Sequence, residues 1–205
     1  LEERDFANAT NIFTEREAAK ILKKGCRPEI QDVTKPLYNR VKDKDAVTKM
    51  QYVDLHLWLV HDILMKGDKM GMANSLEVRV PFLDRNVLEL AESLPLQYKV
   101  QAPRTKVALR AAAERSIRNK TAEKKKLGFP IPIRVWLKEE KYYNRVRAMF
   151  ASSMAKKFFN TDLLMKMLED HRDGKNTNEK ADDSRKIWTV YIFLVWYDRF
   201  FEHGK

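Results

Sequence analysis

The chain has 205 residues, 44% hydrophobic and 34% charged, and its 40 Lys and Arg against 29 Asp and Glu give a formal net charge of +11. This composition is typical of a globular protein with a real core, and no apolar run approaches the roughly 20 residues that a membrane span requires. A single cysteine excludes an internal disulfide framework and favours a reducing, cytoplasmic setting. The positive charge is consistent with phosphate-bearing partners, either nucleotide or nucleic acid. It is equally consistent with a solvated basic surface that has no specific partner.

The first predicted elements are helices. Thr14 followed three residues later by Glu17 is a capping box, which predicts the start of a helix that Gly25 ends. Apolar residues then recur at three- and four-residue spacing between Asp45 and Met65. A long amphipathic helix is therefore expected over that range.

Three further helices follow in chain order. Asp84 is a favourable N-cap for a helix that ends at Pro95. An alanine-rich stretch over residues 105–117 predicts the next helix, because alanine has the highest helix propensity. Asn160 is expected to cap another helix, which ends near Gly174.

The end of the chain is predicted to be a polar surface loop over residues 173–183 and then a core helix. That helix is apolar on nearly all sides and carries four large aromatic residues, Trp188, Phe193, Trp196 and Phe200. No strand-like alternation of useful length and no internal repeat is present. The fold class predicted for residues 1–205 is therefore all-α, as a single helical domain.

Two kinds of site are not expected. The six glycines never cluster, so a loop whose backbone amides surround a phosphate is not predicted. The four histidines and the lone Cys26 show no metal-ligand spacing, so no metal site is predicted.

Residues 68–84 combine charged, small and apolar side chains in an order that no regular helix or strand requires. Gly67 and Gly71 are expected to bracket a turn after the long helix. Glu77 and Arg79 alternate with valines, so an extended chain would point both charges to one side. From the residues alone, an ion-pair network that ties this segment to the core is at least as well supported as a ligand-binding site.

Residues 124–133 form a second such segment, in which three lysines precede Leu127, Gly128 and Phe129. Gly128 permits a tight turn, and the prolines that follow stiffen the chain. Adjacent ammonium groups repel one another, so nearby anions stabilise their charged forms. The segment is interpreted either as an exposed basic run or as a held phosphate-binding group.

Both segments resemble parts of glutamine-hydrolysing asparagine synthetases. Residues 68–84 read DKMGMANSLEVRVPFLD and resemble that family's DRMSMAHSLEVRVPFLD, and residues 124–132 resemble its RKKMGFGVP. The sequence departs from this pattern at Lys69, Gly71 and Lys124. The resemblance extends over residues 47–201, roughly, and includes the tryptophan-rich last helix.

The resemblance implies that the chain is the helical C-terminal half of a larger α/β pyrophosphatase-type synthetase domain, related to adenine nucleotide α-hydrolases. The family's SGGxDS and SGxGxDE loops and its N-terminal nucleophilic cysteine have no counterpart here. Residue 1 is leucine rather than methionine, which also favours a piece of a longer protein. The piece is expected to fold but to be inactive alone.

The implied reaction is the ATP-dependent adenylation of aspartate, followed by amidation with glutamine-derived ammonia. By position, Lys126 and Glu77 would be catalytic: Lys126 neutralises charge on the ATP phosphates, and Glu77 lies beside the acceptor substrate. Asp68 and Arg79 would bind substrate by organising that pocket. ATP with Mg²⁺ would be bound mainly by the missing N-terminal synthetase part.

The expected partners are therefore aspartate, ATP, ammonia and the missing synthetase and glutaminase parts of the same protein, with a homodimer possible in the full-length form. No membrane partner is expected, and the resemblance does not favour nucleic acid. Two alternatives stay open: a basic all-helical nucleic-acid-binding module, and a helical adaptor for a protein partner. Strongly salt-dependent oligonucleotide binding would favour the first.

Overall fold

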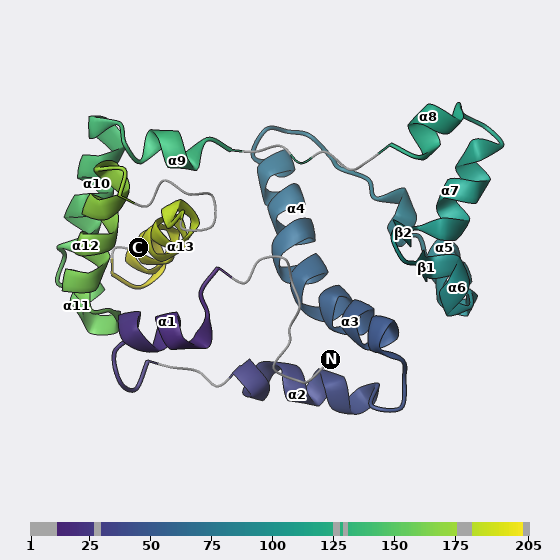
Figure 1. Cartoon of the computed structure of the whole chain (residues 1–205), viewed down its shortest axis with the longest axis horizontal. Helices are drawn as coiled ribbons and strands as arrows, with labels where there is room; N and C mark the ends of the chain where they lie inside the picture. Colours follow the sequence, from purple (N-terminus) through teal and green to yellow (C-terminus); the bar gives the residue numbers. More distant parts are fainter. Residues whose placement is uncertain (1–11, 27–29, 125–127, 129–130, 176–181, 203–205) are drawn as a thin grey trace. The chain divides into compact units, whose positions relative to one another are not determined.

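The computed structural model describes residues 12–26, 30–124, 128, 131–175 and 182–202 (Figure 1). Regular structure in these ranges is almost entirely helical, as predicted. The exception is a two-residue antiparallel hairpin, in which β1 (Val100–Gln101) pairs with β2 (Arg104–Thr105). Residues 100–105 lay below the length at which alternation can be read from sequence.

The described residues group into two compact units, whereas the sequence predicted a single helical domain. The first unit comprises the described part of residues 33–128, and the second comprises that of residues 7–32 and 129–205. The first unit is therefore inserted, in sequence, between two segments of the second.

The second unit contains six α-helices and a short terminal helix among its described residues. They are α1 (Glu15–Ile21), α9 (Ile133–Trp136), α10 (Glu140–Phe150), α11 (Ala155–Phe158), α12 (Thr161–Arg172), α13 (Ser184–Tyr197) and the π-helical η4 (Asp198–Glu202). The α1 helix begins at the predicted capping box: the Thr14 amide donates to Glu17 Oε2 at 2.8 Å, and the Glu17 amide donates to Thr14 Oγ1 at 3.3 Å. The Asn160 cap is also confirmed, since its Oδ1 accepts from the Leu163 amide.

The predicted end of α1 at Gly25 is wrong. The helix ends at Ile21 because the chain leaves it to bond with a segment far along the sequence. The Lys23 amide donates to the Phe158 carbonyl and the Asn160 amide donates to the Ile21 carbonyl, at 2.8 Å each. These bonds place α1 beside α11 and the start of α12 (Figure 1).

The core of the second unit forms where α10, α12 and α13 face one another. Each helix contributes buried residues at helical spacing, namely Tyr143, Val146 and Phe150; Leu164 and Leu168; and Ile187, Val190 and Leu194. The amphipathic spacing of α10 and α12 buries one face of each helix.

The last helix is less buried than its composition suggests. Phe193 packs against the core, but Trp188, Trp196 and Phe200 remain exposed. The expectation that all four aromatic residues lie in the core is therefore wrong for three of them. Among the described residues, α13 packs against other helices on one face, and the aromatic side chains on its other faces therefore remain exposed.

The first unit is a chain of helical segments with the β1–β2 hairpin near its end. They are α2 (Ile30–Arg40, from Val33 onward in this unit), α3 (Ala46–Asp54), the π-helical η1 (Leu55–Leu64), α4 (Met65–Met72), the 3-10 turn η2 (Pro81–Leu83), α5 (Arg85–Ser93), α6 (Leu96–Lys99), α7 (Val107–Glu114) and α8 (Asn119–Ala122). Asp84 caps α5, as predicted, and Asp45, at the predicted start of the long helix, caps α3. The predicted long helix is three consecutive segments, α3, η1 and α4, and it continues to Met72.

The first unit buries few large apolar side chains among its described residues: Tyr38, Val41, Val53 and Val107. Many others are exposed, which contrasts with the contiguous core of the second unit. Among the described residues, no helix is both long and apolar enough to cross a membrane.

Candidate functional site

Residues 68–84 begin inside α4 and return over its end. The amides of Asn74 and Leu76 both donate to the Gly71 carbonyl at 2.9 Å. A Cβ atom on Gly71 would lie 2.7 Å from the Leu76 backbone oxygen, so this conformation leaves no room for a side chain there. Gly71, where the sequence departs from the family segment, therefore has a local structural role: it lets the chain return over the end of α4.

The turn itself is not where the sequence placed it. Gly67 and Gly71 both lie within α4, so the prediction that they bracket a turn is wrong. The reversal falls at residues 73–75, where Ser75 takes the left-handed conformation with φ 56°. Gly71 acts through close approach of the returning chain rather than through a positive φ.

Beyond the turn, residues 76–80 form no helix and no strand, and they lead through η2 to the Asp84 cap of α5. Glu77 and Arg79 are brought together: Arg79 Nη2 lies 2.7 Å from Glu77 Oε1. The prediction that both charges point to one side is therefore confirmed. Their side chains are 68% and 84% exposed, respectively, which leaves both accessible to a ligand.

The ion-pair network considered from sequence reduces to this one exposed pair. Asp68, in the first turn of α4, makes no side-chain hydrogen bond or ion pair with any described residue. An exposed pair contributes about 0–1 kcal/mol, so it does little to hold the segment. Backbone bonds around Gly71 and the Asp84 cap position these residues instead.

Residues 70–90 expose apolar side chains at several positions. Phe82 is 67% exposed, and the others are Met70, Met72, Leu76, Val78, Val80 and Leu90. A group of exposed apolar residues of this kind is typical of an interaction surface or a ligand-binding groove. The charged pair thus lies in a segment suited to burial against a partner surface.

Lys126 lies outside the described residues, as do Lys125 and Leu127. The described residues before Lys126 are held by a cluster of charged side chains that no pattern in the sequence indicated. Arg104 of β2 bonds to Glu114 of α7, at 2.9 Å, and to Glu123 at the end of α8. Arg110 adds a 2.6 Å bond to the Ala122 carbonyl.

This cluster changes the protonation equilibria of its members. The hydrogen bond from Arg104 lowers the pKa of Glu123, and the same bond raises the pKa of Arg104. Both charges are therefore maintained over the physiological range. The contributing residues are 10 and 19 positions apart in sequence, and no local pattern signals such a contact.

The described residues contain no group of three or more His, Cys, Asp or Glu that could hold a metal ion. The chemistry that the segment offers is a carboxylate and a guanidinium in contact, at Glu77 and Arg79, and a further carboxylate, Asp68, on α4. Such groups can bind a zwitterionic substrate or accept a proton.

Comparison with known proteins gives one consistent result. The asparagine synthase family model matches residues 1–198. Asparagine synthetase [glutamine-hydrolyzing] 1 of Bacillus subtilis is 44% identical over 199 residues, which is 96% of this chain and 30% of that protein. A putative asparagine synthetase [glutamine-hydrolyzing] of Mycobacterium bovis is 41% identical over 206 residues, with 100% and 30% covered. The comparison with solved structures gave no match.

Proposed function

Because the chain belongs to the asparagine synthase family, we propose that it is the helical C-terminal part of the synthetase domain of a glutamine-hydrolysing asparagine synthetase. The chain spans about 30% of the length of the curated relatives it matches, so the remaining parts would supply the glutaminase and most of the nucleotide site. The observation that carries this proposal is the 44% identity over almost the whole chain, which includes residues 68–84.

The proposed reaction has two steps. The aspartate side-chain carboxylate attacks the α-phosphorus of ATP, forming an acyl adenylate and releasing pyrophosphate. Ammonia from glutamine then attacks the acyl carbon; a C–N bond forms, the C–O bond to AMP breaks, and the nitrogen loses one proton.

Glu77 is proposed to serve the second step. A carboxylate beside the acceptor site can bind the incoming amine or accept the proton that leaves nitrogen, and general-base catalysis contributes roughly 10²–10⁴-fold. The exposure of the Glu77 side chain, at 68%, supports this assignment because the carboxylate is accessible to a ligand. Arg79 and Asp68 are proposed to bind and orient aspartate.

Lys126 is proposed to serve the first step. Negative charge develops as pyrophosphate leaves, and a fixed positive charge at that point is among the largest electrostatic contributions a protein can make. ATP with Mg²⁺ is proposed to be bound mainly by the rest of the protein. The contribution proposed for this chain to the first step is the positive charge of Lys126, and the complete enzyme is proposed to act in the cytoplasm.

The apolar residues exposed around Phe82 and on α5 support the proposal that the first unit packs against the rest of the synthetase domain. Neither alternative from the sequence, a nucleic-acid-binding module or a protein adaptor, has a relative among the matches described. The exposed apolar residues would suit an adaptor equally, so activity decides between them.

The test is expression of the complete protein and of this chain alone. With ATP, aspartate and either glutamine or ammonia, the complete protein is expected to form asparagine, AMP and pyrophosphate in equal amounts. The isolated chain is expected to form none. Asparagine formation by the isolated chain, or its absence from the complete protein with intact fold, contradicts the proposal.

The separate roles are tested by exchange of labelled pyrophosphate into ATP with aspartate present. Lys126→Ala is expected to abolish this exchange, whereas Glu77→Gln is expected to retain it and lose asparagine formation. Lys124→Ala serves as the matched lysine control. Equal loss of exchange in all three variants would contradict the assignment of the two residues to different steps.

A further inference from the structure

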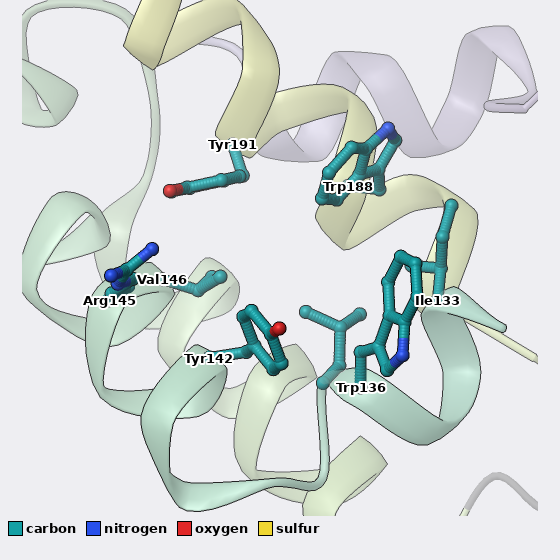
Figure 2. A pocket seen from close by; sticks show the side chains of 8 residues that line it. Ile133, Trp136, Tyr142, Arg145, Val146, Trp188 and Tyr191 are labelled. Atoms are coloured by element: carbon teal, nitrogen blue, oxygen red, sulfur yellow. The ribbon is translucent and has the colours of Figure 1, made fainter. Parts of the chain in front are cut away.

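The second unit contains an aromatic pocket that is separate from the residues proposed for synthesis. Its volume is about 180 Å³, and its walls come from α9, α10 and α13 (Figure 2). The lining residues are Ile133, Trp136, Leu137, Tyr142, Arg145, Val146, Trp188 and Tyr191. All of them belong to the unit with the contiguous core, so the pocket stands on packed helices.

The floor of the pocket is part of that core. Leu137 and Val146 are each 2% exposed. Trp136 and Trp188 are each 37% exposed, although both are large apolar side chains on a well-packed unit. Tryptophan faces that border an open pocket offer stacking surfaces to a flat ring.

Three polar side chains that line the pocket make no hydrogen bond with any described residue. Arg145 is the one charged residue in the lining, and it makes no hydrogen bond or ion pair with any described residue. The hydroxyl groups of Tyr142 and Tyr191 likewise have no hydrogen-bond partner among the described residues. Figure 2 shows Arg145 and Tyr191 at one end of the pocket and the two tryptophans at the other.

Charge decides which ligand fits. An aromatic cage can bind a cation through its ring faces, but Arg145 in the lining repels one. Lys141 lies 5.5 Å from the centre of the Tyr142 ring and adds a second positive charge, and no carboxylate lines the pocket. A guanidinium without a partner matches a carboxylate through two parallel hydrogen bonds.

Size limits the apolar part to one ring, since a cavity of about 150 Å³ in another protein holds benzene. We propose that this pocket binds a small planar aromatic carboxylate, with its ring between Trp136 and Trp188 and its carboxylate on Arg145. This binding site lies outside the residues proposed for asparagine synthesis, and it does not depend on that proposal.

The experiment is a titration of the ¹⁵N-labelled chain with sodium benzoate, followed through its four indole N–H signals in NMR spectra. Trp136 and Trp188 are expected to shift in a saturable way. Trp58 of η1 and Trp196, which do not line the pocket, are internal controls. Benzamide and benzylamine, the neutral and cationic ligands of similar size, are expected to bind at least about tenfold more weakly, because they lack the charge-assisted bonds.

Arg145→Gln is expected to weaken benzoate binding about tenfold or more and to leave benzamide binding unchanged. Arg147→Gln, an exposed arginine on the same helix that does not line the pocket, is the matched control. Both variants should keep the wild-type melting temperature, since both side chains are exposed. The proposal is overturned by equal affinity for benzoate and benzamide, by equal shifts at Trp58 and Trp196, or by unchanged benzoate binding in Arg145→Gln.

Discussion

Lys186 of α13 donates a 2.6 Å hydrogen bond to Glu17 of α1, which joins residues 169 positions apart in sequence. The same ammonium group lies 2.9 Å from Asp183, so one lysine holds carboxylates from both ends of the second unit's sequence. The hydrogen bond from Lys186, together with the Thr14 bonds, lowers the pKa of Glu17 to about 2. The Lys186–Glu17 ion pair thus links α1 to α13, the long C-terminal helix of the second unit.

The first prediction is a pH dependence. A depressed carboxyl pKa adds stability that is present above the unfolded value, about 4.3, and is lost as pH falls through about 2. Glu17→Gln is expected to lower the free energy of unfolding by about 1–2 kcal/mol at pH 6, after allowance for a side chain that is 39% exposed.

The difference between wild type and Glu17→Gln should therefore shrink between pH 4.5 and pH 2, as measured by urea unfolding. Glu15→Gln, in the same turn of α1, is the control and is expected to show no comparable pH-dependent difference. A constant difference across this range would mean that packing, rather than the Lys186 pair, holds α1.

The second prediction separates function from stability at the exposed pair. Glu77→Gln removes a charge that contributes less than about 1 kcal/mol to folding, so the urea midpoint of the chain should barely move. In the complete protein the same change is expected to reduce the rate of asparagine formation about 100-fold or more. Glu89→Gln, which breaks the exposed pair with Arg85, is the matched control and should leave the rate unchanged.

The third prediction concerns the cluster that ends beside the lysine segment. Arg104→Gln removes bonds to both Glu114 and Glu123, so α8 loses its tie to the hairpin. Backbone amides of α8 are then expected to exchange hydrogen faster, while those of α12 keep their wild-type rates. Arg115→Gln is the control on the same part of the chain. Unchanged exchange in α8 would show that backbone and apolar contacts are sufficient.

The fourth prediction contrasts the two units. Leu168→Ala removes a fully buried side chain and is expected to cost about 2–5 kcal/mol in the isolated chain. Phe82→Ala removes an exposed one and is expected to change stability there by less than about 0.5 kcal/mol. In the complete protein, Phe82→Ala should become destabilising, because the proposed packing buries that ring. Equal effects of Phe82→Ala in both forms would contradict that packing.

Local signals in the sequence predicted the structure well. The Thr14–Glu17 box and the caps at Asp84 and Asn160 each depend on bonds within three residues, and each is confirmed. The pairing of Glu77 with Arg79 is also local, since alternation along an extended chain sets it.

Long-range contacts account for what the sequence could not predict. The α1 helix ends early because its last carbonyl bonds to Asn160, far along the sequence. The role of Gly71 depends on the backbone conformation of the turn that follows it, which the sequence pattern does not specify. The exposure of the α13 tryptophans could not be predicted from composition, because composition does not show how many faces of a helix pack against other helices. The Arg104 cluster joins side chains from β2, α7 and the end of α8, so it depends on the tertiary fold rather than on a local pattern.

The insertion of one unit within the sequence of the other has a consequence for synthesis. The Lys186 that binds Glu17 leaves the ribosome only after 169 further residues have been added. At about 5–20 residues per second, Lys186 is added roughly 8–34 seconds after Glu17. During that interval the Glu17 carboxylate has no native lysine partner. All described residues of the first unit are therefore synthesised before the second unit can close.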